Sequence, residues 1–170
     1  MNKKQLIHYI NRNMLGGLIN IGNTCYFNTA LQCLYNIKDL NKYFLFSKEF
    51  KSELRGDSIE KPFTLKYYET FQILLSNDYI NPGDLFKNML ILCREKGIPC
   101  RYGNQEDSQE YLLYILDFIH ESLKYSIDIK YEIEVKNDLD EQLLKSSQIW
   151  NNLIKDDYSI IVDLFYGQFM

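Results

Sequence analysis

Apolar side chains recur with the helical period of about 3.6 residues over several stretches of this sequence. Phe27, Ala30, Leu31 and Leu34 fall at positions i, i+3, i+4 and i+7 and predict one apolar helix face. Similar stripes predict helices over 63–75, 85–93 and 112–123, and the last is the most regular. Asn23 or Thr24 is the expected N-cap of the first helix, which places Cys25 in its first turn.

Other stretches follow different patterns. Ile129, Tyr131, Ile133 and Val135 alternate with charged residues and predict a strand. Residues 40–50 are apolar without a clear period, residues 51–61 predict a loop, and residues 137–147 are polar before a short helix that carries Trp150 and Leu153.

The organisation expected from these patterns is simple. Residues 1–15 form a polar lead-in, and residues 16–170 form one unit without internal repeats or a low-complexity linker. The apolar run 160–165 lies close to residue 170, so we expect Ile160, Ile161, Val162, Leu164 and Phe165 to be exposed as a patch. The alternative is that the run folds back onto Trp150 and Leu153 and becomes buried.

Composition excludes some classes of function. Hydrophobic residues make up 46% of the chain and charged residues 25%, a balance typical of a globular protein. The net charge of -4 argues against nucleic-acid binding, which favours basic surfaces. No apolar run approaches the roughly 20 residues of a membrane span, and no secretory signal is recognisable, so we expect a cytoplasmic or nuclear protein, in the host cell if the source is viral.

Four cysteines are present, and two of them are interpreted as structural. Cys93 and Cys100 are expected to be small buried thiols, because free cysteine is among the most buried residue types. No C-x-x-C pair occurs, so neither a metal site nor a cofactor is expected.

Cys25 is the candidate nucleophile. A helix N-terminus stabilises a thiolate through its unpaired N–H groups and its dipole. The Asn20 amide, five residues upstream, could donate a hydrogen bond to an oxyanion. On these residues alone, the favoured interpretation is that Cys25 is a buried helix residue and that Asn23 only caps the helix.

The sequence around Cys25 resembles a known motif. Gly17 to Gln32 reads GLINIGNTCYFNTALQ, which resembles the cysteine box G-L-x-N-x-G-N-T-C-Y-x-N-x-x-L-Q of the ubiquitin-specific proteases, with every fixed position present. The resemblance implies that Cys25 is the nucleophile and that Asn20 contributes to the oxyanion hole. It also implies the papain-like cysteine protease fold of the α+β class, of which this chain would be an incomplete part, mostly the helical N-terminal lobe (the thumb).

Two further blocks support this resemblance. Gln105 to Tyr111 reads QEDSQEY and resembles the family's Q-x-D-A-x-E-F helix, with two mild replacements. By resemblance, Gln105, Asp107 and Glu110 would bind the arginine-containing tail of ubiquitin, although Asp107 and Glu110 could instead only cap the helix. A looser block, 150–168, resembles the entry into the family's fingers region.

No candidate general base is evident. His8 lies in the lead-in, and His120 matches a non-catalytic helix histidine of the family and is interpreted as a packing or surface residue. We therefore expect a thiol-dependent deubiquitinase whose base lies in a missing C-terminal part of the catalytic domain or in another chain. The alternatives are a catalytically dead ubiquitin-binding module or decoy and an unrelated helical interaction domain. The expected partners are ubiquitin or ubiquitinated proteins.

Overall fold

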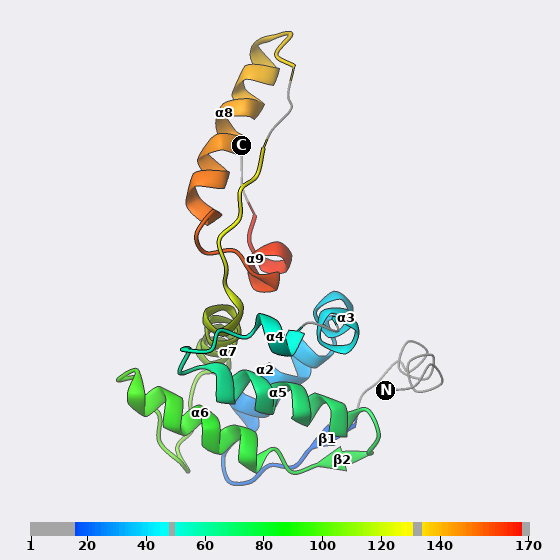
Figure 1. Ribbon diagram of the computed structural model, residues 1–170. Coiled ribbons are helices and arrows are strands. Elements are labelled where there is room, and N and C mark those ends of the chain that lie inside the picture. The colour runs from blue at the N-terminus through cyan, green and yellow to red at the C-terminus, as the bar shows by residue number, and fades with distance from the viewer. Residues whose placement is uncertain (1–15, 48–49, 131–133, 168–170) are drawn as a thin grey trace.

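A computed structural model describes residues 16–47, 50–130 and 134–167, which are mostly helical (Figure 1). The elements are β1 (Gly17–Leu18), α2 (Cys25–Tyr35), α3 (Lys38–Phe46), α4 (Phe50–Glu53), α5 (Lys61–Leu74), β2 (Tyr79–Ile80), α6 (Gly83–Glu95), α7 (Ser108–Leu123), α8 (Asp138–Ile154) and α9 (Ile160–Phe165). The two short strands pair in parallel, with Gly17 opposite Tyr79 and Leu18 opposite Ile80.

The four helices predicted from apolar periodicity all form, as α2, α5, α6 and α7, and their apolar faces meet in one core. Aromatic rings fill much of it: the ring centroids of Phe27 and Phe86 lie 5.1 Å apart, and those of Phe63 and Phe118 lie 5.5 Å apart. Each such ring is at most 1% exposed, and burial of one phenylalanine contributes roughly 1.5–3 kcal/mol. This core fixes where the N-terminus of α2 lies.

The region between α2 and α5 contains more helix than the sequence pattern predicted. Residues 38–46 form α3, although the apolar stretch 40–50 has no clear period. Helix α4 begins at Phe50, just before the loop predicted over 51–61, and extends into it. Phe44 and Phe50 are both buried, with ring centroids 5.0 Å apart, so packing between aromatic side chains stabilises these short helices.

The strand predicted over 129–135 is wrong for the residues that the structure describes there; residues 131–133 lie outside them. The backbone pairs with the end of α8 instead. The Ile127 amide donates to the Lys155 carbonyl at 2.7 Å, and the Asn151 side-chain amide donates to the Ile129 carbonyl at 3.3 Å. An alternating pattern forms a strand only where a neighbouring strand can complete the ladder.

Helix α8 is longer than the short helix predicted around Trp150, because it begins within the polar stretch. Asn137 caps it by accepting a hydrogen bond from the Asp140 amide at 3.0 Å. Acidic side chains in the first turn interact favourably with the positive end of the helix dipole. Figure 1 shows that α8 projects away from the other helices. Leu139, Ile149 and Leu153 on it are 63%, 66% and 68% exposed.

The run 160–165 is not the exposed patch that the sequence predicted. It forms α9, capped by the Ser159 hydroxyl, which accepts from the Ile161 amide at 3.1 Å. Ile161 and Val162 are buried, and Ile160 and Leu164 are partly buried, because α9 packs against α7 and α3. Of the five apolar residues in this run, Phe165 is the exposed one, at 39%.

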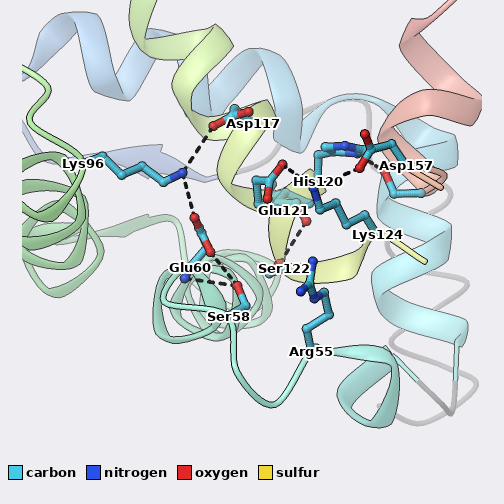
Figure 2. Close-up of polar contacts among 12 residues, drawn as sticks. Arg55, Ser58, Glu60, Lys96, Asp117, His120, Glu121, Ser122, Lys124 and Asp157 are labelled. Atoms are coloured by element: carbon cyan, nitrogen blue, oxygen red, sulfur yellow. Dashed lines mark hydrogen bonds and ion pairs between the residues drawn. The ribbon is translucent and has the colours of Figure 1, made fainter. Parts of the chain in front are cut away.

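Polar contacts join α5, α6 and α7 at one edge of the core (Figure 2). The Glu60 carboxylate, which is 8% exposed, accepts from Lys96 at 2.7 Å and from the Ser58 hydroxyl at 2.6 Å. Lys96 also lies 3.9 Å from Asp117 of α7. None of the helices in the described part of the chain is long and apolar enough to cross a membrane.

Candidate active site

The loop before Cys25 is organised by the side chain of Asn20. Its Oδ1 atom accepts hydrogen bonds from the Gly22 amide at 3.2 Å, the Thr24 amide at 3.0 Å and the Thr24 hydroxyl at 3.2 Å. The Thr24 hydroxyl in turn accepts from the Ile21 amide at 3.2 Å. The loop occupies the acceptor Oδ1, so the Nδ2 group is the part of the Asn20 amide that remains to donate a hydrogen bond to an oxyanion.

The backbone turns sharply at two consecutive residues of this loop. Gly22 has a φ of 118° and Asn23 a φ of 54°, both in the left-handed region. Glycine reaches such angles without a steric penalty, and asparagine tolerates them better than most residues. The positive φ angles therefore explain why the motif has glycine and asparagine at positions 22 and 23.

Cys25 is exposed and is the first residue of α2. Thr24 occupies the N-cap position, as predicted, but its side chain makes no capping hydrogen bond to the helix. The first-turn N–H groups thus keep their capacity to stabilise negative charge beside the thiol. The interpretation of Cys25 as a buried helix residue is wrong.

Two amide side chains of α2 hold the preceding strand in place, and sequence reasoning missed both. Asn28 Nδ2 donates to the carbonyls of Leu18 at 3.3 Å and Ile19 at 3.1 Å, and Gln32 Nε2 donates to Gly16 at 2.8 Å. The available signal was that Asn28 and Gln32 are fixed positions of the motif. They act by fixing the position of β1 relative to α2.

An open groove runs along this face of α2, and it contains both predicted catalytic residues. Its lining residues are Leu18, Asn20, Cys25, Asn28, Thr29, Gln32, Cys33 and Asn36. Cys25 and Asn20 therefore border the same accessible space.

The segment before α7 contacts the Cys25 loop directly. The Tyr102 hydroxyl donates to the Ile21 carbonyl at 2.7 Å, and Asn23 Nδ2 donates to the Gly103 carbonyl at 2.8 Å. These residues are about 80 positions apart in the sequence. The structure therefore brings together the two sequence blocks that carry the predicted catalytic and substrate-binding residues.

Gln105, Asp107 and Glu110 are exposed at the start of α7, outside the lining of the Cys25 groove. Asp107 Oδ1 accepts from the amides of Gln109 at 2.7 Å and Glu110 at 3.3 Å, so the helix cap predicted for Asp107 is confirmed. Glu110 accepts from the Tyr114 hydroxyl, which raises the pKa of Tyr114 to about 12. A capping carboxylate retains lone pairs for a second partner, so the cap leaves a role in substrate binding open.

His120 lies in a different place from Cys25. Its Nδ1 is 2.8 Å from the Ser159 hydroxyl, and its ring lines a groove between α7 and α9. Burial lowers its pKa, outweighing the opposite effect of Glu121 and Asp157. This geometry agrees with a packing histidine, while His8 lies outside the described residues. No cluster of side chains suited to a metal ion occurs among the residues described.

Comparison with known proteins connects this geometry to a family. Residues 16–170 match the family described as "Ubiquitin carboxyl-terminal hydrolase". The chain is 36% identical over 162 residues to ubiquitin carboxyl-terminal hydrolase 15 of Xenopus tropicalis, covering 91% of this chain and 16% of that protein. It is 34% identical over 156 residues to ubiquitin carboxyl-terminal hydrolase 32 of Homo sapiens, covering 89% of this chain and 10% of that protein. Ubiquitin carboxyl-terminal hydrolase 12 of Saccharomyces cerevisiae is 29% identical over 170 residues, with coverages of 90% and 13%. The chain therefore spans no more than about a sixth of the length of these relatives.

Proposed function

Because the chain belongs to the ubiquitin carboxyl-terminal hydrolase family, we propose that it carries the nucleophile of a cysteine hydrolase that cleaves bonds at the C-terminus of ubiquitin. The observation that carries this proposal is the position of Cys25, exposed at the N-terminus of α2 in the same groove as Asn20. The family's fold is papain-like, and the described residues form mainly its helical N-terminal lobe.

Each catalytic role follows from local chemistry. The Cys25 thiolate attacks the carbonyl carbon of the (iso)peptide bond, and the C–S bond forms as the carbonyl oxygen becomes an oxyanion. Asn20 Nδ2 donates to that oxyanion, since Oδ1 is already held by the loop. Collapse of the intermediate releases the amine, and water then hydrolyses the acyl-thioester.

Ubiquitin would be held beside this groove by the start of α7. Gln105, Asp107 and Glu110 present two carboxylates and an amide, and a carboxylate pairs well with the guanidinium groups of an arginine-containing tail. The Tyr102 and Asn23 hydrogen bonds fix this segment against the Cys25 loop, so both parts could contact one extended peptide.

Among the described residues, no histidine lines the Cys25 groove to remove the thiol proton. His120 contacts Ser159 and lines the α7–α9 groove rather than the Cys25 groove. The base would therefore come from outside the described residues or from another chain. We expect residues 1–170 alone to give no measurable turnover of a fluorogenic ubiquitin C-terminal amide, because loss of the base removes orders of magnitude from such catalysis.

Covalent labelling tests whether Cys25 is the nucleophile without requiring catalytic turnover. Ubiquitin that carries an electrophile at its C-terminus should form a covalent adduct at Cys25 of the isolated chain, located by peptide mapping. Cys25→Ser should abolish the adduct, whereas Cys33→Ser should not, although Cys33 is exposed and lines the same groove. Two outcomes would contradict the proposal. One is labelling of Cys33; the other is a rate of Cys25 labelling by the ubiquitin probe that is no higher than the rate with a small electrophile lacking ubiquitin.

A further inference from the structure

A second pair of thiols lies outside the Cys25 groove. Cys93 is fully buried in the last turn of α6. The chain then reverses at Gly97, with a φ of 68°, and the Ile98 amide donates to the Cys93 carbonyl at 2.8 Å. This reversal packs Cys100 against the core cluster that contains Cys93, close enough for the two thiols to shift each other's pKa.

Cys100 is the reactive member of the pair by its surroundings. It is partly exposed, and its sulfur lies 2.6 Å from the Tyr111 hydroxyl. The hydrogen bond from Cys93 lowers the pKa of the Cys100 thiol to about 7 against the effect of burial, and Tyr111 acts in the same direction as Cys93. A substantial fraction of Cys100 is therefore thiolate at neutral pH.

We propose that Cys93 and Cys100 form a dithiol–disulfide site that is oxidised by hydrogen peroxide or another small hydroperoxide. The Cys100 thiolate attacks one peroxide oxygen, so an S–O bond forms, the O–O bond breaks and hydroxide leaves and is protonated to water. Cys93 then attacks the Cys100 sulfur, the S–S bond forms, and the second hydroxide takes the Cys93 proton. Two thiols and one peroxide give one disulfide and two waters, and a dithiol reductant reverses the reaction.

The site is connected to the Cys25 loop through the chain that follows Cys100. Tyr102 and Gly103, two and three residues further on, make the hydrogen bonds to Ile21 and Asn23. Formation of the disulfide also removes the Cys100–Tyr111 hydrogen bond, and the Tyr111 ring packs on that of Tyr26 with centroids 4.5 Å apart. The oxidation itself does not depend on the proposed role of Cys25.

Peptide mapping tests the site. The Cys25→Ser/Cys33→Ser form of the 170-residue chain, which lacks the two exposed thiols, is treated with hydrogen peroxide at pH 7, alkylated in urea and digested with trypsin. Cleavage after Lys87, Arg94, Lys96 and Arg101 separates the two cysteines onto peptides 88–94 and 97–101. We expect these two peptides to be recovered joined, with the loss of two hydrogens, and separated by dithiothreitol.

Comparing the rate of disulfide formation in the folded chain with the rate in urea shows whether the fold, rather than the short sequence separation, makes the two thiols reactive. A pKa near 7 instead of about 8.5 raises the thiolate fraction at pH 7 roughly fifteenfold, and lower nucleophilicity offsets about fivefold of this. The folded chain should therefore form the joined peptides about threefold faster than the same chain in urea. Equal rates, or oxidation of Cys100 to sulfinic acid while Cys93 is recovered alkylated, would overturn the proposal.

Two variants serve as controls for folding. Cys100→Ser keeps a hydrogen-bonding group beside Tyr111 and should leave Cys93 as a thiol that peroxide does not oxidise, because Cys93 is buried and burial raises its pKa. Cys93→Ser keeps a hydrogen-bond donor beside Cys100 and should leave Cys100 as a sulfenic acid that a dimedone probe traps. Absence of that adduct in folded Cys93→Ser would show that Cys100 is not the attacking thiol.

Discussion

At the residue scale, the fixed positions around Cys25 divide into groups that face the groove and groups that hold the loop. Asn20 belongs to both, because Oδ1 accepts three hydrogen bonds from the loop and Nδ2 remains as a donor. Asn28 and Gln32 hold the backbone of and beside strand β1. Gly16 precedes the motif, and a glycine is required there for a steric reason. A Cβ atom at Gly16 would lie 2.2 Å from the Asn77 carbonyl oxygen.

Asp107 has two roles that substitution can separate. Asp107→Ala removes both capping hydrogen bonds of α7 and should lower the free energy of unfolding by about 1 kcal/mol, measured by urea denaturation. Asp107→Asn keeps an acceptor oxygen, so its stability should stay near that of the wild type. If the carboxylate also binds the ubiquitin tail, both variants should bind ubiquitin more weakly. Undiminished binding by Asp107→Asn would contradict the substrate role.

At the element scale, α5, α6 and α7 are joined by polar contacts as well as by the aromatic core. Burial by itself would raise the pKa of Glu60, but hydrogen bonds from Lys96 and Ser58 outweigh it and lower the pKa. This carboxylate is therefore ionised and nearly buried at neutral pH (Figure 2). Its ionised state makes the joint between α5 and α6 sensitive to the loss of either partner.

Lys96→Met should destabilise the chain by about 2 kcal/mol at pH 7, less than the roughly 3–5 kcal/mol typical of a fully buried pair, because the Lys96 side chain is 25% exposed. Glu60→Gln in the same chain should recover part of the loss by removing the unpaired charge. The folded-state pKa of Glu60 is depressed, so its stabilisation is present above about pH 4.5 and is lost as pH falls through the folded pKa. The cost of Lys96→Met should shrink over that range in urea titrations; a constant cost would contradict this account.

His120 should make the α7–α9 contact depend on pH. Its folded-state pKa lies below the unfolded value of about 6.5, so the fold favours the neutral ring. The resulting stabilisation is complete above pH 6.5 and is lost as pH falls through the folded pKa. Between pH 7.5 and 5.5 the urea midpoint of the wild type should fall more than that of His120→Asn, whose amide can still bond Ser159. Identical slopes would exclude His120, because the other titrating groups are common to both proteins.

At the scale of the whole molecule, exposed large apolar side chains occur on several elements, and the projecting helix α8 carries more of them than the run 160–165. Leu139, Ile149 and Leu153 of α8 are each more than 60% exposed, and Ile154 is the buried residue of this helix. Large apolar patches on a soluble protein mark interaction surfaces or promote association. Because α8 projects from the other helices, we expect its apolar side chains to be accessible to a partner (Figure 1).

We expect the purified chain to bind a hydrophobic dye and to self-associate at high concentration, as measured by fluorescence and light scattering. Ile149→Glu/Leu153→Lys should reduce both effects, because it replaces exposed apolar groups on α8. Ile91→Glu is the matched control, since Ile91 is 46% exposed on α6, and it should change neither. A monomer that binds no dye would show that α8 is not an association surface.

The sequence by itself determined the parts of this protein that depend on local chemistry. Apolar periodicity located α2, α5, α6 and α7, because a helix repeats its buried face every few residues. The order of fixed residues from Gly17 to Gln32 indicated the family and placed Cys25 in the first turn of a helix.

Only the tertiary structure decided the features that depend on contacts between distant residues. The alternation over 129–135 carries no information about a neighbouring strand, and the apolar run 160–165 carries none about the faces of α7 and α3 that cover it. Periodicity describes one segment, whereas burial and pairing depend on which segments meet. For the same reason, only the fold showed that Tyr102 holds the Cys25 loop and that Cys100 lies close to Cys93.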